Sequence, residues 1–260
     1  MRENRIIKKA LTVLCFGFVW MWVLRPIDAV GSWSPSLEQD SEAEYESRVL
    51  QKKGDTYHIE VRFPEITSSY ISFSVKGRVD TAIREYVDRI SKTDIQAFIE
   101  ESPELLVDYD GILENELRID FKVIKLTPRF ISVKFERYFY GAGAAHGMSI
   151  AVCFNYDLRN LKELRLSDFF EENRDYLQQI SDYAVRDLKR QAQSENKNPE
   201  AMYPWIEDGA SPTEENLGRF TFDGNSLTVY FDPYQVGSGG WGSREVDVRS
   251  AELKGFKANL

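Results

Sequence analysis

The segment that most constrains the fold runs from Tyr138 to Phe170, where a glycine-rich bend separates two apolar stretches. Glycines at positions 141, 143 and 147 allow the positive φ angles and close backbone approach that a tight bend requires. The flanking stretches, residues 130–139 and 148–156, have the composition of β-strands. The sequence therefore predicts two paired strands joined by this bend, with His146 within it.

Strand pairs alternate with single amphipathic helices along the rest of the chain. Apolar residues at every second position predict strands, and apolar residues three and four positions apart predict helices. A polar stretch broken by proline and glycine, residues 194–216, is expected to be a long loop. This order predicts an α+β fold with antiparallel sheets covered by helices in two subdomains. The expected strands are 45–50, 57–63, 116–123, 130–139, 148–156, 220–222, 227–231 and 244–248, and the expected helices start near Val75 and Tyr176.

The N-terminal segment predicts export. Four basic residues precede an apolar run from Ala10 to Leu24, which is short for a spanning helix of about 20 residues and long for a signal-peptide core. Ala29 offers a cleavage site, whereas Trp20 and Trp22 suit the interfacial end of a retained helix. Residues 1–29 are therefore expected to be either a signal peptide or an anchor that holds the chain in the inner membrane through residues 10–24. In both cases the folded part is expected to be extracytoplasmic, in the periplasm or at the cell surface.

Three further boundaries follow from composition. Residues 30–42, which are rich in serine, proline and acidic residues, are expected to form a linker. Residues 43–110 are expected to form a small N-terminal α+β subdomain, and residues 111–260 a larger C-terminal α+β domain.

Charge and cysteine content limit the partners and the means of stabilisation. The formal net charge is −9, and it becomes −12 without residues 1–29, which carry five basic and two acidic residues. Such a chain repels nucleic acid and attracts cationic proteins. Cys15 lies in the apolar run, so Cys153 would have no partner for an internal disulfide in the exported part.

Few residues suit catalysis or metal binding. A zinc site needs about four Cys or His ligands, and the exported part offers only His58, His146 and Cys153, without clustered spacing. We expect no metal and no cofactor. His146 could act as a general base oriented by Asp157, since both flank one strand. The alternative, that His146 holds the bend by hydrogen bonds, is preferred.

The motifs in their order resemble the extracytoplasmic domain shared by the lysozyme-sensing anti-sigma factor RsiV and PdaC-type peptidoglycan deacetylases. The matching segments are the bend itself, Asn155 to Leu158, Leu164 to Phe170, Tyr57 to Pro64 and Leu227 to Val236, and the resemblance covers residues 43–255. Two departures are the turn at residues 159–162, which lacks glycine, and the looser loop at residues 237–242.

The resemblance implies a non-catalytic domain of the cell envelope that binds a lysozyme-like protein or peptidoglycan. The family's deacetylase chemistry resides in a separate catalytic domain that this sequence does not contain. A different class of function remains open, namely a hydrolase of envelope glycan or peptide that uses His146 with a nearby aspartate. Aromatic residues in loops and around the bend are the candidate binding residues, because exposed Tyr and Trp commonly anchor partners: Tyr140, Gly141, Gly143, His146, Trp205, Tyr234 and Trp241.

Overall fold

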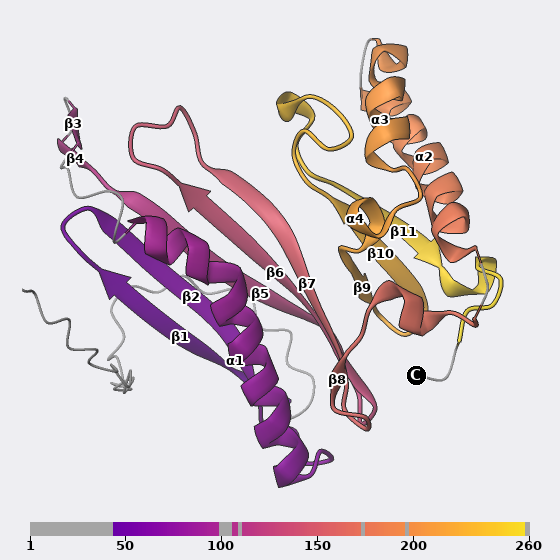
Figure 1. The fold of residues 1–260 in the computed structure, drawn as a ribbon, viewed down its shortest axis with the longest axis horizontal. Helices are drawn as coiled ribbons and strands as arrows, with labels where there is room; N and C mark the ends of the chain where they lie inside the picture. The colour runs from indigo at the N-terminus through magenta and orange to yellow at the C-terminus, as the bar shows by residue number, and fades with distance from the viewer. Residues whose placement is uncertain (1–43, 99–105, 109–110, 173–174, 196–197, 258–260) are drawn as a thin grey trace, which may run out of the picture. The chain divides into compact units, whose positions relative to one another are not determined.

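The computed structural model describes residues 44–98, 106–108, 111–172, 175–195 and 198–257 (Figure 1). The expected signal peptide or anchor, residues 1–29, and the expected linker, residues 30–42, lie outside the described residues. No helix within the described part of the chain is long and apolar enough to cross a membrane. Residues 42–260 form one compact unit.

A six-stranded sheet contains most of the N-terminal half, in the order β1-β2-β5-β6-β7-β8. All neighbouring strands are antiparallel except β2 and β5, which are parallel. A parallel pair needs a long crossover connection, and the helix α1 (Phe73–Gln96) provides it. The strands are β1 (Tyr45–Lys53), β2 (Tyr57–Ile66), β5 (Asn115–Leu126), β6 (Phe130–Tyr140), β7 (Met148–Asp157) and β8 (Lys162–Glu163), and a small hairpin of β3 (Leu106–Asp108) and β4 (Gly111–Leu113) precedes β5.

The helix α1 begins at a serine cap and buries one face. Ser72 Oγ accepts a hydrogen bond from the amide of Val75, which satisfies one of the free N–H groups of the first turn. Val79, Ile83 and Val87 recur at helical spacing and are buried in one cluster with the inward residues of β2, β5, β6 and β7. The first core therefore lies between α1 and one face of the six-stranded sheet.

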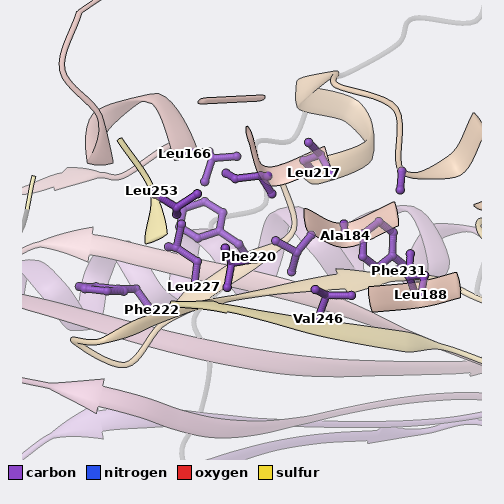
Figure 2. Close-up of a cluster of buried hydrophobic side chains, with 14 of the residues drawn as sticks. Leu166, Ala184, Leu188, Leu217, Phe220, Phe222, Leu227, Phe231, Val246 and Leu253 are labelled. Atoms are coloured by element: carbon purple, nitrogen blue, oxygen red, sulfur yellow. The ribbon is translucent and has the colours of Figure 1, made fainter. Parts of the chain in front are cut away.

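A second core lies in the C-terminal half, between a three-stranded sheet and the helix α2 (Tyr176–Glu195). The sheet consists of β9 (Phe220–Phe222), β10 (Ser226–Phe231) and β11 (Arg244–Arg249), all antiparallel, in the order β11-β10-β9. Figure 2 shows Ala184 and Leu188 of α2 beside Phe231 and Val246 of the sheet. Phe169, from the short helix η2 (Leu166–Phe169), packs edge-on against Phe220 and Phe222 at 5.3 and 5.4 Å between ring centroids.

The two sheets meet at a buried polar junction. Ser132 of β6 donates a hydrogen bond to Asn155 of β7, and each side chain also bonds the backbone of β9. Because β9 is anchored here, the outward face of β6 and β7, opposite α1, lies against the second sheet.

The predicted α+β class, the strands and both long helices are confirmed. One prediction was wrong: residues 194–216 are not a loop but contain η3 (Pro199–Met202), α3 (Tyr203–Gly209) and α4 (Glu214–Leu217). Apolar residues at 206, 210 and 217 are fully buried and hold these short helices to the second core. The remaining one-turn helices are η4 (Gly239–Trp241) and η5 (Ser250–Glu252).

The two cores divide the chain at a different point from the expected boundary at residue 110. Residues 59–158 supply the first cluster, and residues from Leu164 onward, with Phe130, supply the second. The strand β5, which the sequence placed in the larger domain, pairs with β2 of the smaller one as well as with β6. Local sequence carries little information on such a parallel pairing, because the two strands are separated by a whole helix.

Candidate functional site

A cleft of about 360 Å³ lies between the two sheets. The alternation of β6 explains its chemistry: Val133 and Phe135 face the first core, so Lys134 and Glu136 point the other way. The cleft is lined by Lys134 and Glu136 of β6, residues 149–151 of β7, Tyr230 and Phe231 of β10, residues 243–245 at the start of β11, and Gln191 of α2.

Lys134 is the cation at the centre of one wall. Its Nζ atom lies 4.6 Å from the centre of the Tyr230 ring, a cation–π contact. Among the residues that the structure describes, Lys134 has no carboxylate in ion-pair contact. The Tyr230 hydroxyl is hydrogen-bonded to Thr221 at 3.0 Å, and burial raises the pKa of Tyr230 to about 12, so the ring stays neutral.

Arg244, on the opposite wall, is held from several sides. Its guanidinium lies 4.3 Å from the Trp241 ring, its Nη1 atom bonds Glu195 at 3.0 Å, and its Nε atom donates to the Trp241 carbonyl at 3.1 Å. The Trp241 indole also donates to Glu195, at 3.0 Å. Trp241 is only 8% exposed, so its ring packs against Arg244. It does not offer the exposed surface that was expected of a binding residue.

A second ion pair lies near β7, beside the cleft. Arg219 and Asp232 are in contact at 3.3 Å. Burial raises the pKa of Asp232, and the positive charge of Arg219 opposes that rise. Burial also raises the pKa of the neighbouring Cys153 thiol to about 12, so the thiolate, which is the reactive form, is scarce at neutral pH.

The glycine bend is built by local contacts. Gly143 has a φ of 83°, and a side chain at Gly147 would collide with the Tyr138 ring at 2.3 Å. The amide of Ala142 donates a hydrogen bond of 2.8 Å to the Asn115 side chain. This bond anchors the bend, which runs from Gly141 to Gly147, to the start of β5. His146 is exposed, and its Nδ1 lies 3.0 Å from the carbonyl of the adjacent Gly147.

The structure does not bring His146 and Asp157 together. They lie at opposite ends of β7, about 30 Å apart at the rise of a β-strand. Asp157 closes the turn after β7, where its carboxylate accepts hydrogen bonds from the amides of Arg159 and Asn160 and from the Asn160 side chain, at 2.7–2.9 Å. The proposed pairing of this histidine with Asp157 is therefore wrong.

Two of the aromatic candidates are exposed. Trp205 on α3 is 46% exposed and Tyr234, between β10 and η4, is 52% exposed. Tyr234 has a φ of 69°, an unusual angle for a residue other than glycine, and its ring lies so close to Gly239 that a side chain there would collide with it at 2.3 Å. Both remain candidates for contact with a partner.

The described residues contain no group of three or more His, Cys, Asp or Glu side chains arranged to hold a metal ion. The cleft residues were missed by the sequence reasoning. The signal was present as polar residues at alternate positions of β6, but nothing local indicates which other strand such a face will meet.

Comparisons with known proteins agree with this architecture. Residues 167–250 match the family described as protein of unknown function DUF3298. The peptidoglycan-N-acetylmuramic acid deacetylase PdaC of Bacillus subtilis (strain 168) is 28% identical over 210 residues, which are 80% of this chain and 41% of PdaC. The chain thus spans about two fifths of the length of this curated relative.

Two solved structures share the fold. A DUF3298 family member from Bacteroides fragilis has a TM-score of 0.53 at 16% identity, covering 83% of this chain and 94% of that one. A DUF3298 family protein from Pseudomonas aeruginosa has a TM-score of 0.58 at 13% identity, covering 82% and 94%. These matches confirm the predicted resemblance: residues 167–250 are similar to the DUF3298 family, and the chain is similar to PdaC.

Proposed function

We propose that this chain is an extracytoplasmic binding domain of the cell envelope that holds a fragment of peptidoglycan in the cleft between its two sheets, without catalysing a reaction. The observation that carries the proposal is the cleft itself. It combines a lysine that lies over an aromatic ring and has no ion-pair partner among the described residues, an arginine held by several contacts, and two exposed carboxylates, Glu136 and Glu245. Charged groups that are fixed in place around an aromatic surface suit the recognition of a small polar ligand.

Two further observations support binding rather than catalysis. His146 is not among the residues that line the cleft, and Asp157 is engaged in its own turn. Cys153, on the strand β7 that lines the cleft, has a pKa raised to about 12, and its thiol is therefore poorly suited to attack a substrate.

The similarity to PdaC supports peptidoglycan as the ligand, since the name of that protein places its activity on peptidoglycan. It also supports an extracytoplasmic location, with residues 1–29 as the export signal or anchor. A second candidate partner is a cationic lysozyme-like protein. The formal net charge of −9 favours it, because opposite charges speed association at low salt.

A thermal-shift titration of the purified chain tests both partners. We expect muropeptides to raise the melting temperature with dose, because a ligand that binds only the folded state stabilises it by about 2.7 kcal/mol at 100 times its Kd. Lysozyme binding would show a shift at low salt that shrinks at high salt. Absence of any shift with millimolar muropeptide, or release of cleaved product, would overturn the proposal.

A further inference from the structure

We propose that the cleft recognises the peptide part of peptidoglycan: a short peptide with a free carboxylate pairs with the exposed edge of β7 at residues 149–151. The inference rests on the proposed function and narrows its ligand from peptidoglycan in general to the peptide stem. It comes from the backbone of β7, from the charges beside it and from the size of the cleft.

Within the described part of the chain, the edge of β7 that faces away from β6 is paired with another strand only at its C-terminal end. β7 pairs with β6 along its whole length, and on the other side β8 pairs with Tyr156 and Asp157. An uncovered strand edge presents backbone N–H and C=O groups that can pair with another chain. Residues 149–151, at the open end of this edge, line the cleft.

The bonds already made on this edge show which residues point outward. The Asn155 carbonyl accepts from the Leu164 amide at 2.7 Å, and the Cys153 carbonyl accepts from the Tyr86 hydroxyl at 2.8 Å. The Ala151 amide faces the Asp232 carboxylate. This contact lowers the pKa of Asp232, but burial raises that pKa by more. Alternate residues of an antiparallel strand direct their backbone groups to the same side. The backbone N–H and C=O of Ser149 therefore also point away from β6.

At residues 149–151, three backbone groups therefore have no partner among the described residues and remain for a ligand: the N–H and C=O of Ser149 and the C=O of Ala151. At about 3.3 Å per residue, residues 149–151 span about 10 Å, which matches two or three residues of an extended peptide. Peptides that add to a sheet edge gain affinity from such main-chain hydrogen bonds and specificity from the neighbouring side chains. A cleft of about 360 Å³ suits a short peptide rather than a long strand.

The side chains beside the edge carry both signs of charge. Lys134 is half-buried and has no ion-pair partner within the described parts of the chain, so it can take a ligand carboxylate. Glu136, directly opposite Ala151 on β6, and Glu245 across the cleft are likewise free of ion pairs among those residues. This arrangement complements a peptide that bears both a carboxylate and an amino group. Glycan strands freed of peptides carry the lactyl carboxylates of muramic acid but no amino group, so they would leave Glu136 and Glu245 unmatched.

Calorimetric titration of the full chain with three probes tests the inference: a synthetic peptidoglycan stem pentapeptide, its C-terminal amide, and glycan strands freed of peptides. We expect saturable binding of the pentapeptide, at least tenfold weaker binding of the amide, and no binding of the glycan, because a charged hydrogen bond is worth roughly tenfold or more. Lys134→Met should remove the preference for the free acid.

Two variants of one residue test the edge itself. Ser149→Pro removes the outward N–H without breaking a bond to β6, and proline is tolerated near the start of an edge strand. We expect it to weaken pentapeptide binding severalfold, while Ser149→Ala, which keeps the N–H, binds like the wild type. Circular dichroism and the melting temperature check that both variants fold.

The outcomes separate the two proposals. If the glycan binds and the pentapeptide does not, the peptide inference fails and the proposed function stands; if no probe binds, both fail. If Ser149→Pro folds and binds the pentapeptide as well as Ser149→Ala does, the pairing with β7 is overturned. Protection of the Ser149 amide from hydrogen exchange on adding pentapeptide would support the pairing, and an unchanged exchange rate would contradict it.

Discussion

The hydroxyl of Ser132 donates a 2.7 Å hydrogen bond to the side-chain oxygen of Asn155, and both side chains are buried between the two sheets. The Asn155 amide in turn donates to the Phe220 carbonyl at 2.8 Å, and Ser132 accepts from the Phe222 amide at 3.0 Å. Two strands of one sheet are thereby bonded to β9 of the other. This junction fixes where the cleft opens.

Asn155→Ala is expected to destabilise the fold by about 2–3 kcal/mol. The substitution leaves the buried Phe220 carbonyl without its partner, and a buried polar group that loses its partner carries the full desolvation cost. Urea unfolding measures the change. Ser238→Ala, at an exposed position, is the control and should change stability by less than about 0.5 kcal/mol. When Asn155→Ala and Ser132→Ala are combined, the loss of stability should be smaller than the sum of the two single losses, because both substitutions break the same hydrogen-bond network.

The two tryptophans of the C-terminal half should behave differently. Trp241→Ala is expected to cost about 3 kcal/mol, because the ring is 8% exposed and supports Arg244. Trp205→Ala should cost less than about 1 kcal/mol, since nearly half of that side chain faces solvent. Chemical denaturation of the two variants measures both values. Equal losses would contradict the buried position of Trp241.

Asp157 should make stability depend on pH in the acid range. Burial alone would raise its pKa, but hydrogen bonds from Asn160 and the Arg159 amide outweigh burial and lower the pKa below 3.8. Because the folded-state pKa is below the unfolded value of about 3.9, the stabilisation is complete above that value and is lost as pH falls through the lower pKa.

Asp157→Ala should therefore be less stable than the wild type by about 1–2 kcal/mol at pH 7, and the difference should shrink as the pH falls below about 4. Urea unfolding at a series of pH values follows it. A difference that stays constant down to pH 2 would show that the carboxylate charge plays no part.

The hydrolase alternative has a direct test in His146. His146→Ala should leave the melting temperature nearly unchanged, because the ring is exposed and makes one hydrogen-bond contact among the described residues, with the adjacent residue. We expect neither the wild type nor the variant to release products from cell-wall fragments. Turnover by the wild type that disappears in a fully folded His146→Ala would establish the enzymatic role instead.

Much of the fold could be predicted because the signals are local. The alternation at Tyr57, Ile59, Val61 and Phe63 and the helical spacing at Val79 and Ile83 each reflect burial of one face. The short helices of residues 199–217 escaped prediction because polar composition hid a few buried anchors, such as Ile206 and Leu217.

The site was less predictable for a related reason. Trp205 and Trp241 both lie in segments that the sequence predicts to be loops, yet Trp241 is packed against an arginine and nearly half of Trp205 is exposed. The cleft depends on β6 and β7 meeting β10 and β11, strands about 80 to 110 residues away in the chain. Such a meeting is decided by tertiary packing, and neither strand's own sequence indicates which strand it will meet.

Co-sedimentation with insoluble peptidoglycan, followed by analysis of the soluble fraction, tests the central claim most directly. We predict that the wild-type chain sediments with peptidoglycan in a saturable manner, that Lys134→Met sediments at least several times less, and that no fragment is released. A wild-type chain that stays in solution, or one that liberates glycan or peptide fragments, would contradict the account of a binding domain.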